Sequence, residues 1–221
     1  MVGRRISEAE NVADETIAAY GTHASAYRDY NRDLPAHIRS ELERFAAAVG
    51  AGRRVLEIGS GGGRDAAYLE SQGLQVRRTD VTPAFVDLLR EDGFTADVID
   101  PLHDDLTDPD QPHEPYDAVW ANACLLHVKR ADLPTVLERL RHATRPGGLL
   151  RFSVKGGDGE AWLNRGPVTA PRLFVYWNET DLRAVVDQAG WTAMRITGAP
   201  GLGAEHWLEV WATNEADRAS A

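Results

Sequence analysis

The stretch VLEIGSGGG, residues 55–63, decides the fold. Its first four residues form a short apolar run, as in a buried strand of a parallel sheet. The glycines that follow let backbone N–H groups come close to a ligand at the start of a helix. Residues 64–72 predict that helix, and Gly73 ends it. A strand, a glycine loop and a helix in this order form the first half of a nucleotide-binding α/β unit.

Strands and helices continue to alternate after this unit. We expect further strands at residues 75–79, 96–99, 118–120 and 149–154, with helices that start at Thr82-Pro83 and around Leu133. A helix capped by Asn178 and an antiparallel strand pair at 192–197 and 207–212 follow. Residues 155–171, rich in glycine and proline, are expected to form a long loop. The pattern predicts an α/β fold with a Rossmann-like, seven-stranded, mostly parallel sheet, one antiparallel strand near the C-terminus, and helices on both faces.

The chain divides into four segments. Residues 1–15 are polar and are expected to form a flexible tail. Residues 16–52 predict a helical cap, interrupted at Gly21, and a first helix that ends at Gly50. Residues 53–213 form the α/β domain, and residues 214–221 form a polar tail.

Composition limits the class of protein. The 221 residues carry 24 Lys and Arg against 34 Asp and Glu, a net charge of 24 − 34 = −10. This acidic balance argues against nucleic acid as the main partner, because phosphate binding relies on clustered cations. The only cysteine, Cys124, cannot form an internal disulfide, and no apolar run or apolar N-terminal segment predicts a membrane span or a signal peptide. We expect a soluble, cytoplasmic protein of one globular domain.

Asp80 strengthens the nucleotide-binding interpretation. It lies 21 residues after Gly59, at the end of the second expected strand. A carboxylate in this position can accept hydrogen bonds from both hydroxyls of a ribose. The alternative is a helix-capping or turn residue.

The glycine pattern and Glu57 separate two classes of cofactor. A dinucleotide site needs G-x-G-x-x-G/A, but counted from Gly59 the third position is Arg64. Counted from Gly61 the pattern is met, although the loop then moves away from the strand end. An acid at position 57 would repel a pyrophosphate and tolerate a cofactor with an amino group and a sulfonium. The residues favour S-adenosylmethionine (SAM) over a nicotinamide cofactor.

Four features in order resemble the class I SAM-dependent methyltransferases: VLEIGSGGG, Asp80, the segment YDAVWANACLLHV at 116–128, and the turn RPGGLL at 145–150. The resemblance covers residues 53–213. It implies that SAM is the cofactor and that the cofactor-binding residues are Glu57, Gly59, Ser60, Gly61 and Gly63 around the methionine part, Asp80 at the ribose, Val81 and Asp100 with Pro101 or Leu102 at the adenine, and Ala121 through its backbone. Asp104, Asp105 or Leu106 are alternatives on the adenine side.

Methyl transfer from SAM is an in-line displacement that depends mainly on alignment, so a dedicated base is optional. His127, after the fourth strand, is the candidate base, because an imidazole titrates in the useful range. The alternative is a histidine packed under the cap. Candidate substrate-binding residues are the aromatic or imidazole side chains Tyr20, Tyr27, Tyr176, Trp177 and His206, for which simple packing is the alternative.

Other reactive side chains are assigned smaller roles. Arg28 and Arg64 are candidates for binding the cofactor carboxylate, with solvated surface arginines as the alternative. Cys124 is expected to be a small buried residue. No His, Asp or Glu cluster has metal-ligand spacing, and His103 and His113 lie in a polar loop, so we expect no metal.

The acceptor class follows from a missing motif. Enzymes that methylate adenine or amide nitrogen would carry Asn/Asp-Pro-Pro-Tyr/Phe after the fourth strand, and ANAC stands there instead. We therefore expect methyl transfer to O, N or S of a small molecule, by a monomer or homodimer. The alternatives are a protein or tRNA methyltransferase and a non-catalytic SAM-binding regulatory protein.

Overall fold

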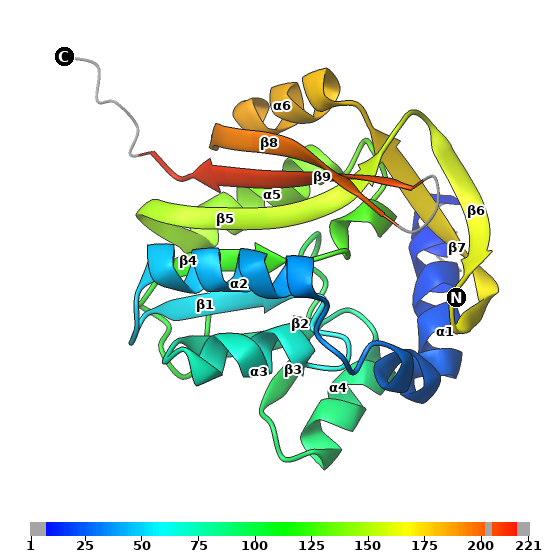
Figure 1. Cartoon of the computed structure of the whole chain (residues 1–221), viewed down its shortest axis with the longest axis horizontal. Coiled ribbons are helices and arrows are strands. Elements are labelled where there is room, and N and C mark those ends of the chain that lie inside the picture. Colours follow the sequence, from blue (N-terminus) through cyan, green and yellow to red (C-terminus); the bar gives the residue numbers. More distant parts are fainter. Residues whose placement is uncertain (1–7, 202–204, 216–221) are drawn as a thin grey trace, which may run out of the picture.

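The computed structural model describes residues 8–201 and 205–215 (Figure 1). Its helices and strands are, in chain order, α1 (Glu8–Tyr30), α2 (Ala36–Val49), β1 (Arg54–Ile58), α3 (Arg64–Ser71), β2 (Gln75–Asp80), α4 (Pro83–Glu91), β3 (Ala96–Val98), β4 (Tyr116–Ala121), the short 3₁₀ helix η1 (Leu125–His127), α5 (Leu133–Ala143), β5 (Thr144–Gly156), β6 (Glu160–Arg165), β7 (Val168–Trp177), α6 (Glu179–Gln188), β8 (Thr192–Pro200) and β9 (His206–Thr213).

The sheet confirms the predicted α/β class. Its strand order is β3-β2-β1-β4-β5-β7-β6, with β9 antiparallel to β5 and β8 antiparallel to β9. The five strands from β3 to β5 in this order are parallel to their neighbours. Because the order reverses between β1 and β4, the carboxyl ends of these two strands flank the crevice in which open α/β sheets bind ligands.

The described residues form nine strands, two more than expected. The additional pair, β6 and β7, comes from residues 155–171 and beyond, where a loop was predicted. A turn at Gly166, with φ of 57°, joins Arg165 to Val168, and the buried run Leu173–Val175 anchors β7. Pro171 stands where the strand register shifts, so its missing N–H interrupts no ladder pair. The predicted long loop is therefore wrong here, because Gly166 forms a hairpin turn and Pro171 lies in an irregular part of β7.

Helices cover both faces of the sheet. On one face, α5 and α6 bury Leu137 and Leu182 in a cluster that includes Leu56 of β1. On the other face, α2 and α3 bury Phe45 in a cluster that includes Val55, the neighbour of Leu56 in the same strand. This alternation follows from the two-residue period of a strand. No helix in the described part of the chain is long and apolar enough to cross a membrane.

Helix α1 is longer than expected and lies beside β7 (Figure 1). It begins at Glu8, inside the segment expected to be a tail, and continues through Gly21 without a break. The side chain of Thr16 accepts a hydrogen bond from the backbone N–H of Leu173 at 3.1 Å, which joins α1 to β7. Residues 1–7 and 216–221 of the expected tails lie outside the described residues, whereas Asn214 is buried and donates to the carbonyl of Thr144 at 2.7 Å.

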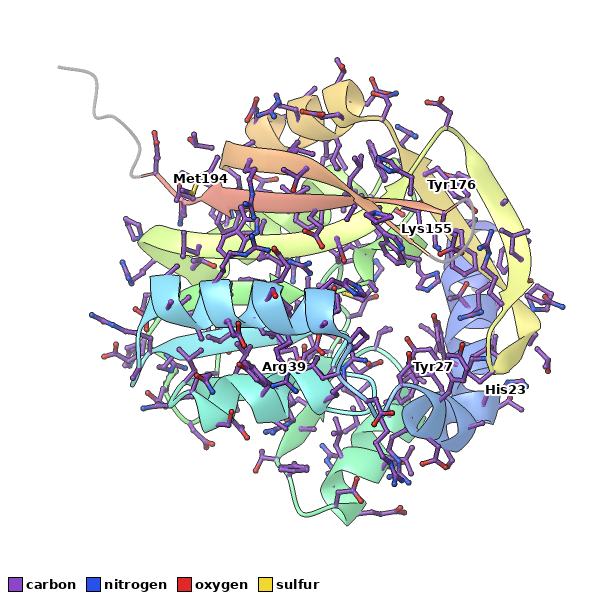
Figure 2. The ribbon with its side chains drawn as sticks, viewed as in Figure 1. His23, Tyr27, Arg39, Lys155, Tyr176 and Met194 are labelled. Carbon is purple, nitrogen blue, oxygen red and sulfur yellow. The ribbon has the colours of Figure 1, made fainter. Side chains whose placement is uncertain are left out.

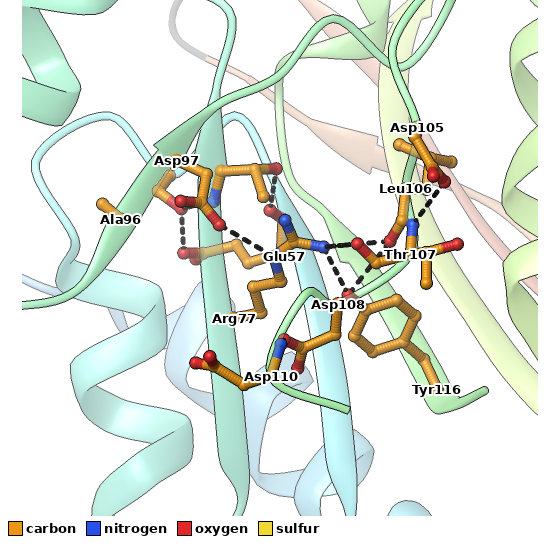
Figure 3. Close-up of polar contacts among 12 residues, drawn as sticks. Glu57, Arg77, Ala96, Asp97, Asp105, Leu106, Thr107, Asp108, Asp110 and Tyr116 are labelled. Atoms are coloured by element: carbon orange, nitrogen blue, oxygen red, sulfur yellow. Dashed lines mark hydrogen bonds and ion pairs between the residues drawn. The ribbon is translucent and has the colours of Figure 1, made fainter. Parts of the chain in front are cut away.

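The loop between β3 and β4 is held by Arg77 of β2 (Figure 3). The guanidinium donates to Asp97 at 2.9 Å and to the hydroxyl of Tyr116 at 2.8 Å. It also donates to the backbone carbonyls of Leu106 and Thr107, at 3.0 and 2.9 Å. One half-buried cation therefore ties a loop without regular structure to two strands of the sheet.

We expect Arg77→Met to lower the free energy of unfolding by about 2 kcal/mol, because it removes the donor to the carbonyl of Thr107 and to the carboxylate of Asp97. Urea denaturation measures this change. The control is Arg183→Met on α6, whose exposed ion pair with Glu179 contributes at most about 0.5 kcal/mol. Equal effects of the two substitutions would show that Arg77 does not anchor the loop.

Candidate functional site

A cavity of about 1520 Å³ opens at the carboxyl ends of β1, β2 and β4 and is covered by α1. Pockets for one drug-sized ligand span roughly 300–1,000 Å³. The cavity therefore has room for two small molecules side by side. Its wall includes the glycine loop after β1 and residues of α1 and β9 that lie far away in the sequence.

The glycine loop needs residues without side chains. Gly59, Gly61 and Gly63 have φ of 71°, 52° and 77°, a region that favours glycine. A Cβ on Gly59 would lie 2.4 Å from Cβ of Cys124, which packs against the loop from the chain after β4. Cys124 was expected to be buried, but it is half-buried and lines the cavity, and desolvation raises the pKa of its thiol.

Asp80 lies at the end of β2, as predicted, with its carboxylate toward the glycine loop. Oδ2 accepts from the backbone N–H of Gly61 at 2.9 Å, and Oδ1 accepts from that of Thr82 at 2.8 Å. Burial raises the pKa of Asp80, opposed by these two hydrogen bonds. Each carboxylate oxygen has a second lone pair, so Asp80 can hold the loop and still accept from two ligand hydroxyls.

Glu57 is buried beside the loop, and its surroundings favour the uncharged, protonated form of its side chain. Ser60 donates to its Oε2 at 2.5 Å. Burial, and next the nearby carboxylate of Asp65, raise the pKa of Glu57 to about 8. At neutral pH the unliganded side chain is therefore mostly protonated. The expected repulsion of a pyrophosphate by a fixed charge at this position is correspondingly weaker than the sequence indicated.

The residues expected near adenine also line the cavity: Val81, Asp100, Pro101 and Leu102. Asp100 accepts from the backbone N–H of Leu102 at 2.8 Å and pairs with His103 at 2.7 Å. The alternatives Asp104, Asp105 and Leu106 do not line the cavity, and Leu106 is part of the core. Asp100 is therefore the acid of this loop that faces the cavity.

Four of the expected residues do not line the cavity: Ala121, Tyr176, Trp177 and His206. Trp177 is buried in the core with the guanidinium of Arg130 at 4.0 Å from its ring centre. Tyr176 of β7 is the strand partner of Lys155 in β5, and both residues are labelled in Figure 2. These side chains belong to strand packing, the alternative stated for aromatic residues.

Arg28 and Arg64 line the cavity but are held by protein groups. Arg28 pairs with Asp92 at 3.1 Å. Arg64 donates to the backbone carbonyls of Asn31 and Asp33, both at 3.1 Å, and so fastens the link between α1 and α2. Neither is a freely solvated surface arginine.

A network of polar side chains in the cavity wall, centred on the half-buried Asn122, was not predicted. The amide of Asn122, just after β4, donates to Asp65 at 2.9 Å and accepts from Arg151 and Ser153, at 2.8 and 3.0 Å. The next residue, Ala123, has φ of 54°, unusual for a residue with a side chain. The segment ANAC at 121–124, noted in the sequence, contains Asn122. The partners of Asn122 could not be predicted from it, because they lie on α3 and β5, which approach β4 only in the folded chain.

The start of β9 contributes to the cavity wall through the neighbours of His206, the residue that the sequence predicted there. Trp207 and Glu209 of β9 line the cavity, with Glu205 just before the strand. Glu205 pairs with Lys155 at 2.6 Å, and burial lowers the pKa of Lys155 to about 8. The sequence therefore predicted a cavity residue at the start of this strand, but Glu205 and Trp207 line the cavity in place of His206.

Tyr20, Tyr27 and His127 line the cavity under α1. Tyr27 points from α1 toward the glycine loop, where a Cβ on Gly61 would be 3.7 Å from its ring (Figure 2). The hydroxyl of Tyr20 lies 2.8 Å from Nε2 of His127. Burial lowers the pKa of His127 to about 4. Within the described residues, no group of three or more His, Cys, Asp or Glu side chains is arranged to hold a metal ion.

Comparison with known proteins gives the family. The sequence profile of the family described as "Methyltransferase domain" matches residues 30–195. The ubiquinone biosynthesis O-methyltransferase of Alkalilimnicola ehrlichii is 28% identical over 166 residues, which cover 71% of this chain and 62% of that relative. The chain thus matches less than two thirds of this relative's length.

Two solved structures share the fold. The 1,6-didemethyltoxoflavin-N1-methyltransferase of Burkholderia thailandensis, with bound 1,6-didemethyltoxoflavin and S-adenosylhomocysteine, has a TM-score of 0.74 at 23% identity and covers 97% of this chain and 94% of its own. The N-methyltransferase NodS of Bradyrhizobium japonicum, in complex with S-adenosylhomocysteine, has a TM-score of 0.69 at 18% identity, with coverage of 92% and 100%. The chain belongs to the methyltransferase domain family and has the fold of the class I SAM-dependent methyltransferases.

Proposed function

We propose that this protein is a SAM-dependent methyltransferase that transfers the methyl group to O, N or S of a small molecule. The observation that carries the proposal is the continuity of one cavity. The same cavity is lined by the glycine loop with Asp80 on one side and by Tyr20 and Trp207 on the other. A methyl donor and an acceptor can therefore meet inside it without a change of site.

The residues present fit this cofactor. Asp80 keeps free lone pairs for ribose hydroxyls, and the glycines leave a cradle that side chains would fill. Glu57 is a buried acid that a ligand with positive charge would ionise. When bound, SAM supplies a methyl group activated by a positively charged sulfur. The chain's own residues hold the two reactants in line and exclude water, which is the main requirement of such a displacement.

The cavity favours a small acceptor. It is covered by α1, and nine Asp and Glu residues line it against four Lys and Arg residues. A tRNA acceptor would need an open groove with an excess of cations. The excess of acids also disfavours acceptors that carry phosphate groups. We propose a neutral or cationic acceptor, and a cytoplasmic location, which the presence of only one cysteine supports.

We expect calorimetric titration to detect binding of SAM and of S-adenosylhomocysteine but not of NAD. Incubation with SAM labelled in the methyl group and a fractionated metabolite extract should then transfer the label to a small molecule. Binding without transfer to any fraction would favour the regulatory alternative. Absence of binding to both SAM-class ligands would refute the proposed function.

We expect Asp80→Ala to weaken SAM binding about tenfold or more, a loss of about 1.4 kcal/mol or more, because both ribose hydroxyls lose their acceptor. Calorimetry measures the dissociation constant. The control is Asp87→Ala, an exposed carboxylate on α4 outside the cavity, which should leave binding unchanged. A dissociation constant unaffected by Asp80→Ala would remove Asp80 from the cofactor site.

Glu57 should link SAM binding to proton release. Its pKa is about 8 in the unliganded protein, and a nearby cation lowers the pKa of a carboxyl group. At a pH between the lower pKa of Glu57 in the SAM complex and its pKa of about 8 in the unliganded protein, SAM binding releases a proton. SAM affinity should therefore rise from pH 6 to pH 8 and level off above pH 8. Calorimetry in buffers of different ionisation enthalpy counts the protons released.

The variant Glu57→Gln should bind SAM without proton release and with an affinity that no longer rises over this pH range. The control Glu91→Gln, an exposed acid on α4, should behave like the wild type. Proton release that persists in Glu57→Gln would assign the linkage to another group.

A further inference from the structure

We propose that the hydroxyl of Tyr20 is the group that contacts the nucleophile of the methyl acceptor, and that His127 is a positioning residue that fixes the hydrogen of this hydroxyl. The inference rests on the proposed methyltransferase function. It assigns His127 a role different from that of a base.

The proposal starts from three hydrogen bonds that join distant parts of the chain. Tyr20 Oη lies 2.8 Å from His127 Nε2 and 2.8 Å from Nη1 of Arg172. His127 Nδ1 lies 2.5 Å from the backbone carbonyl of Leu173. The four residues come from α1, η1 and β7, so the group forms only when α1 and the hairpin pack on the sheet.

The direction of each hydrogen bond follows from the chemistry of its partners. A carbonyl oxygen only accepts, so Nδ1 of His127 carries the hydrogen of a neutral imidazole and Nε2 is left as an acceptor. Tyr20 must therefore donate to Nε2. A guanidinium only donates, so the Tyr20 oxygen accepts from Arg172. Every hydrogen in the group is thereby assigned.

This assignment leaves one free acceptor position, and it belongs to Tyr20. A hydroxyl oxygen has two acceptor positions, and Arg172 occupies one of them. Both ring nitrogens of His127 are used within the group. Because Tyr20 lines the cavity, its oxygen can accept a hydrogen bond from an N–H or O–H of the acceptor molecule. Such a bond would turn the nucleophile's lone pair toward the methyl group.

The surroundings oppose proton uptake by the imidazole. Burial, aided by the positive charges of Arg172 and Lys155 and opposed by the hydrogen bond to Leu173, lowers the pKa of His127 to about 4. Burial also raises the pKa of Tyr20, so the phenol keeps its hydrogen. Neither group takes a proton in the proposed step. The C–S bond breaks as the bond to the nucleophile forms, its electrons pass to sulfur, and the nucleophile's proton stays on the product until solvent removes it.

Aromatic packing holds Tyr20 in this position. Its ring centre lies 5.3 Å from that of Tyr27 and 5.9 Å from that of Phe85. The imidazole in turn lies 5.0 Å from the ring of Phe174. A side chain enclosed in this way costs little further entropy when a ligand binds, which is the property required of a positioning group.

The test compares Tyr20→Phe, His127→Gln and His127→Leu, with Tyr68→Phe as the matched loss of a hydroxyl outside the cavity. Label transfer from methyl-labelled SAM to the metabolite fraction that the wild type methylates gives the rate, and calorimetry gives the dissociation constant of SAM. We expect Tyr20→Phe and His127→Leu to slow transfer about 10- to 100-fold with SAM affinity changed less than about threefold. His127→Gln, whose amide oxygen can accept from Tyr20, should restore most of the rate.

Two results would overturn the proposal. One is a wild-type rate in Tyr20→Phe. The other is a His127→Gln variant as slow as His127→Leu, together with loss of the acidic limb of the pH–rate profile, which would make His127 a base.

An NMR measurement tests the group without any acceptor molecule. In protein labelled with ¹⁵N at histidine, His127 should be neutral at pH 6 with its hydrogen on Nδ1, and Tyr20→Phe should shift the Nε2 resonance. A charged His127, or the other tautomer, would contradict the inference even in a protein that transfers methyl groups. Wild-type protein that binds neither SAM nor S-adenosylhomocysteine would refute the function, while the NMR result would still decide the hydrogen-bond arrangement.

Discussion

The arrangement of the elements around β5 depends on one buried charge, the guanidinium of Arg151. It lies in the middle of β5 with no exposed surface, and burial lowers its pKa to about 10. A charge removed from water requires partners close by. Asn122 after β4 and Glu209 of β9 supply them at 2.8 and 3.3 Å, and Glu41 of α2 lies at 3.8 Å. The chain after β4, strand β9 and helix α2 thus all contact β5 through Arg151, and two of these partners, Asn122 and Glu209, line the cavity.

The cover of the cavity depends on a second set of polar contacts. Helix α1 is joined to β7 through Thr16 and through Tyr20, which accepts from Arg172. Its last turns rest on the glycine loop, where a Cβ on Gly62 would lie 2.8 Å from the side chain of Arg28. The absence of a side chain at this position therefore serves the packing of α1 as well as the approach of a ligand.

The order of strands and helices, and the glycine loop and Asp80 in the cavity wall, could be predicted from the sequence because both are local. A buried strand, a glycine loop and Asp80 lie within 26 residues, and Asn178 caps α6 by accepting from the N–H of Asp181, as its position suggested. On the side formed by α1 and β9, Tyr20, Tyr27 and His127 were predicted, but Trp207 and Glu209 were not. The residues of this side are neighbours only after β9 has paired with β5 and α1 has packed on β7.

Charge states were equally hard to predict. Glu57 and His127 look like an ordinary acid and an ordinary base in the sequence, and burial makes both neutral near pH 7. The hairpin of β6 and β7 was missed because glycine and proline are common to loops and to tight turns between strands. What distinguishes the two cases is the buried run Leu173–Val175, which packs on the sheet.

The two ends of the described chain contribute the part of the cavity wall that α1 and β9 form. Thr16 to Tyr27 come from the beginning, and Glu205 to Glu209 come from the end, whereas Glu57 to Asp80 lie in the continuous unit between them. Substitutions in the terminal segments would therefore change the volume and chemistry of the cavity, while the hydrogen bond between Asp80 and Gly61 lies wholly within the continuous unit.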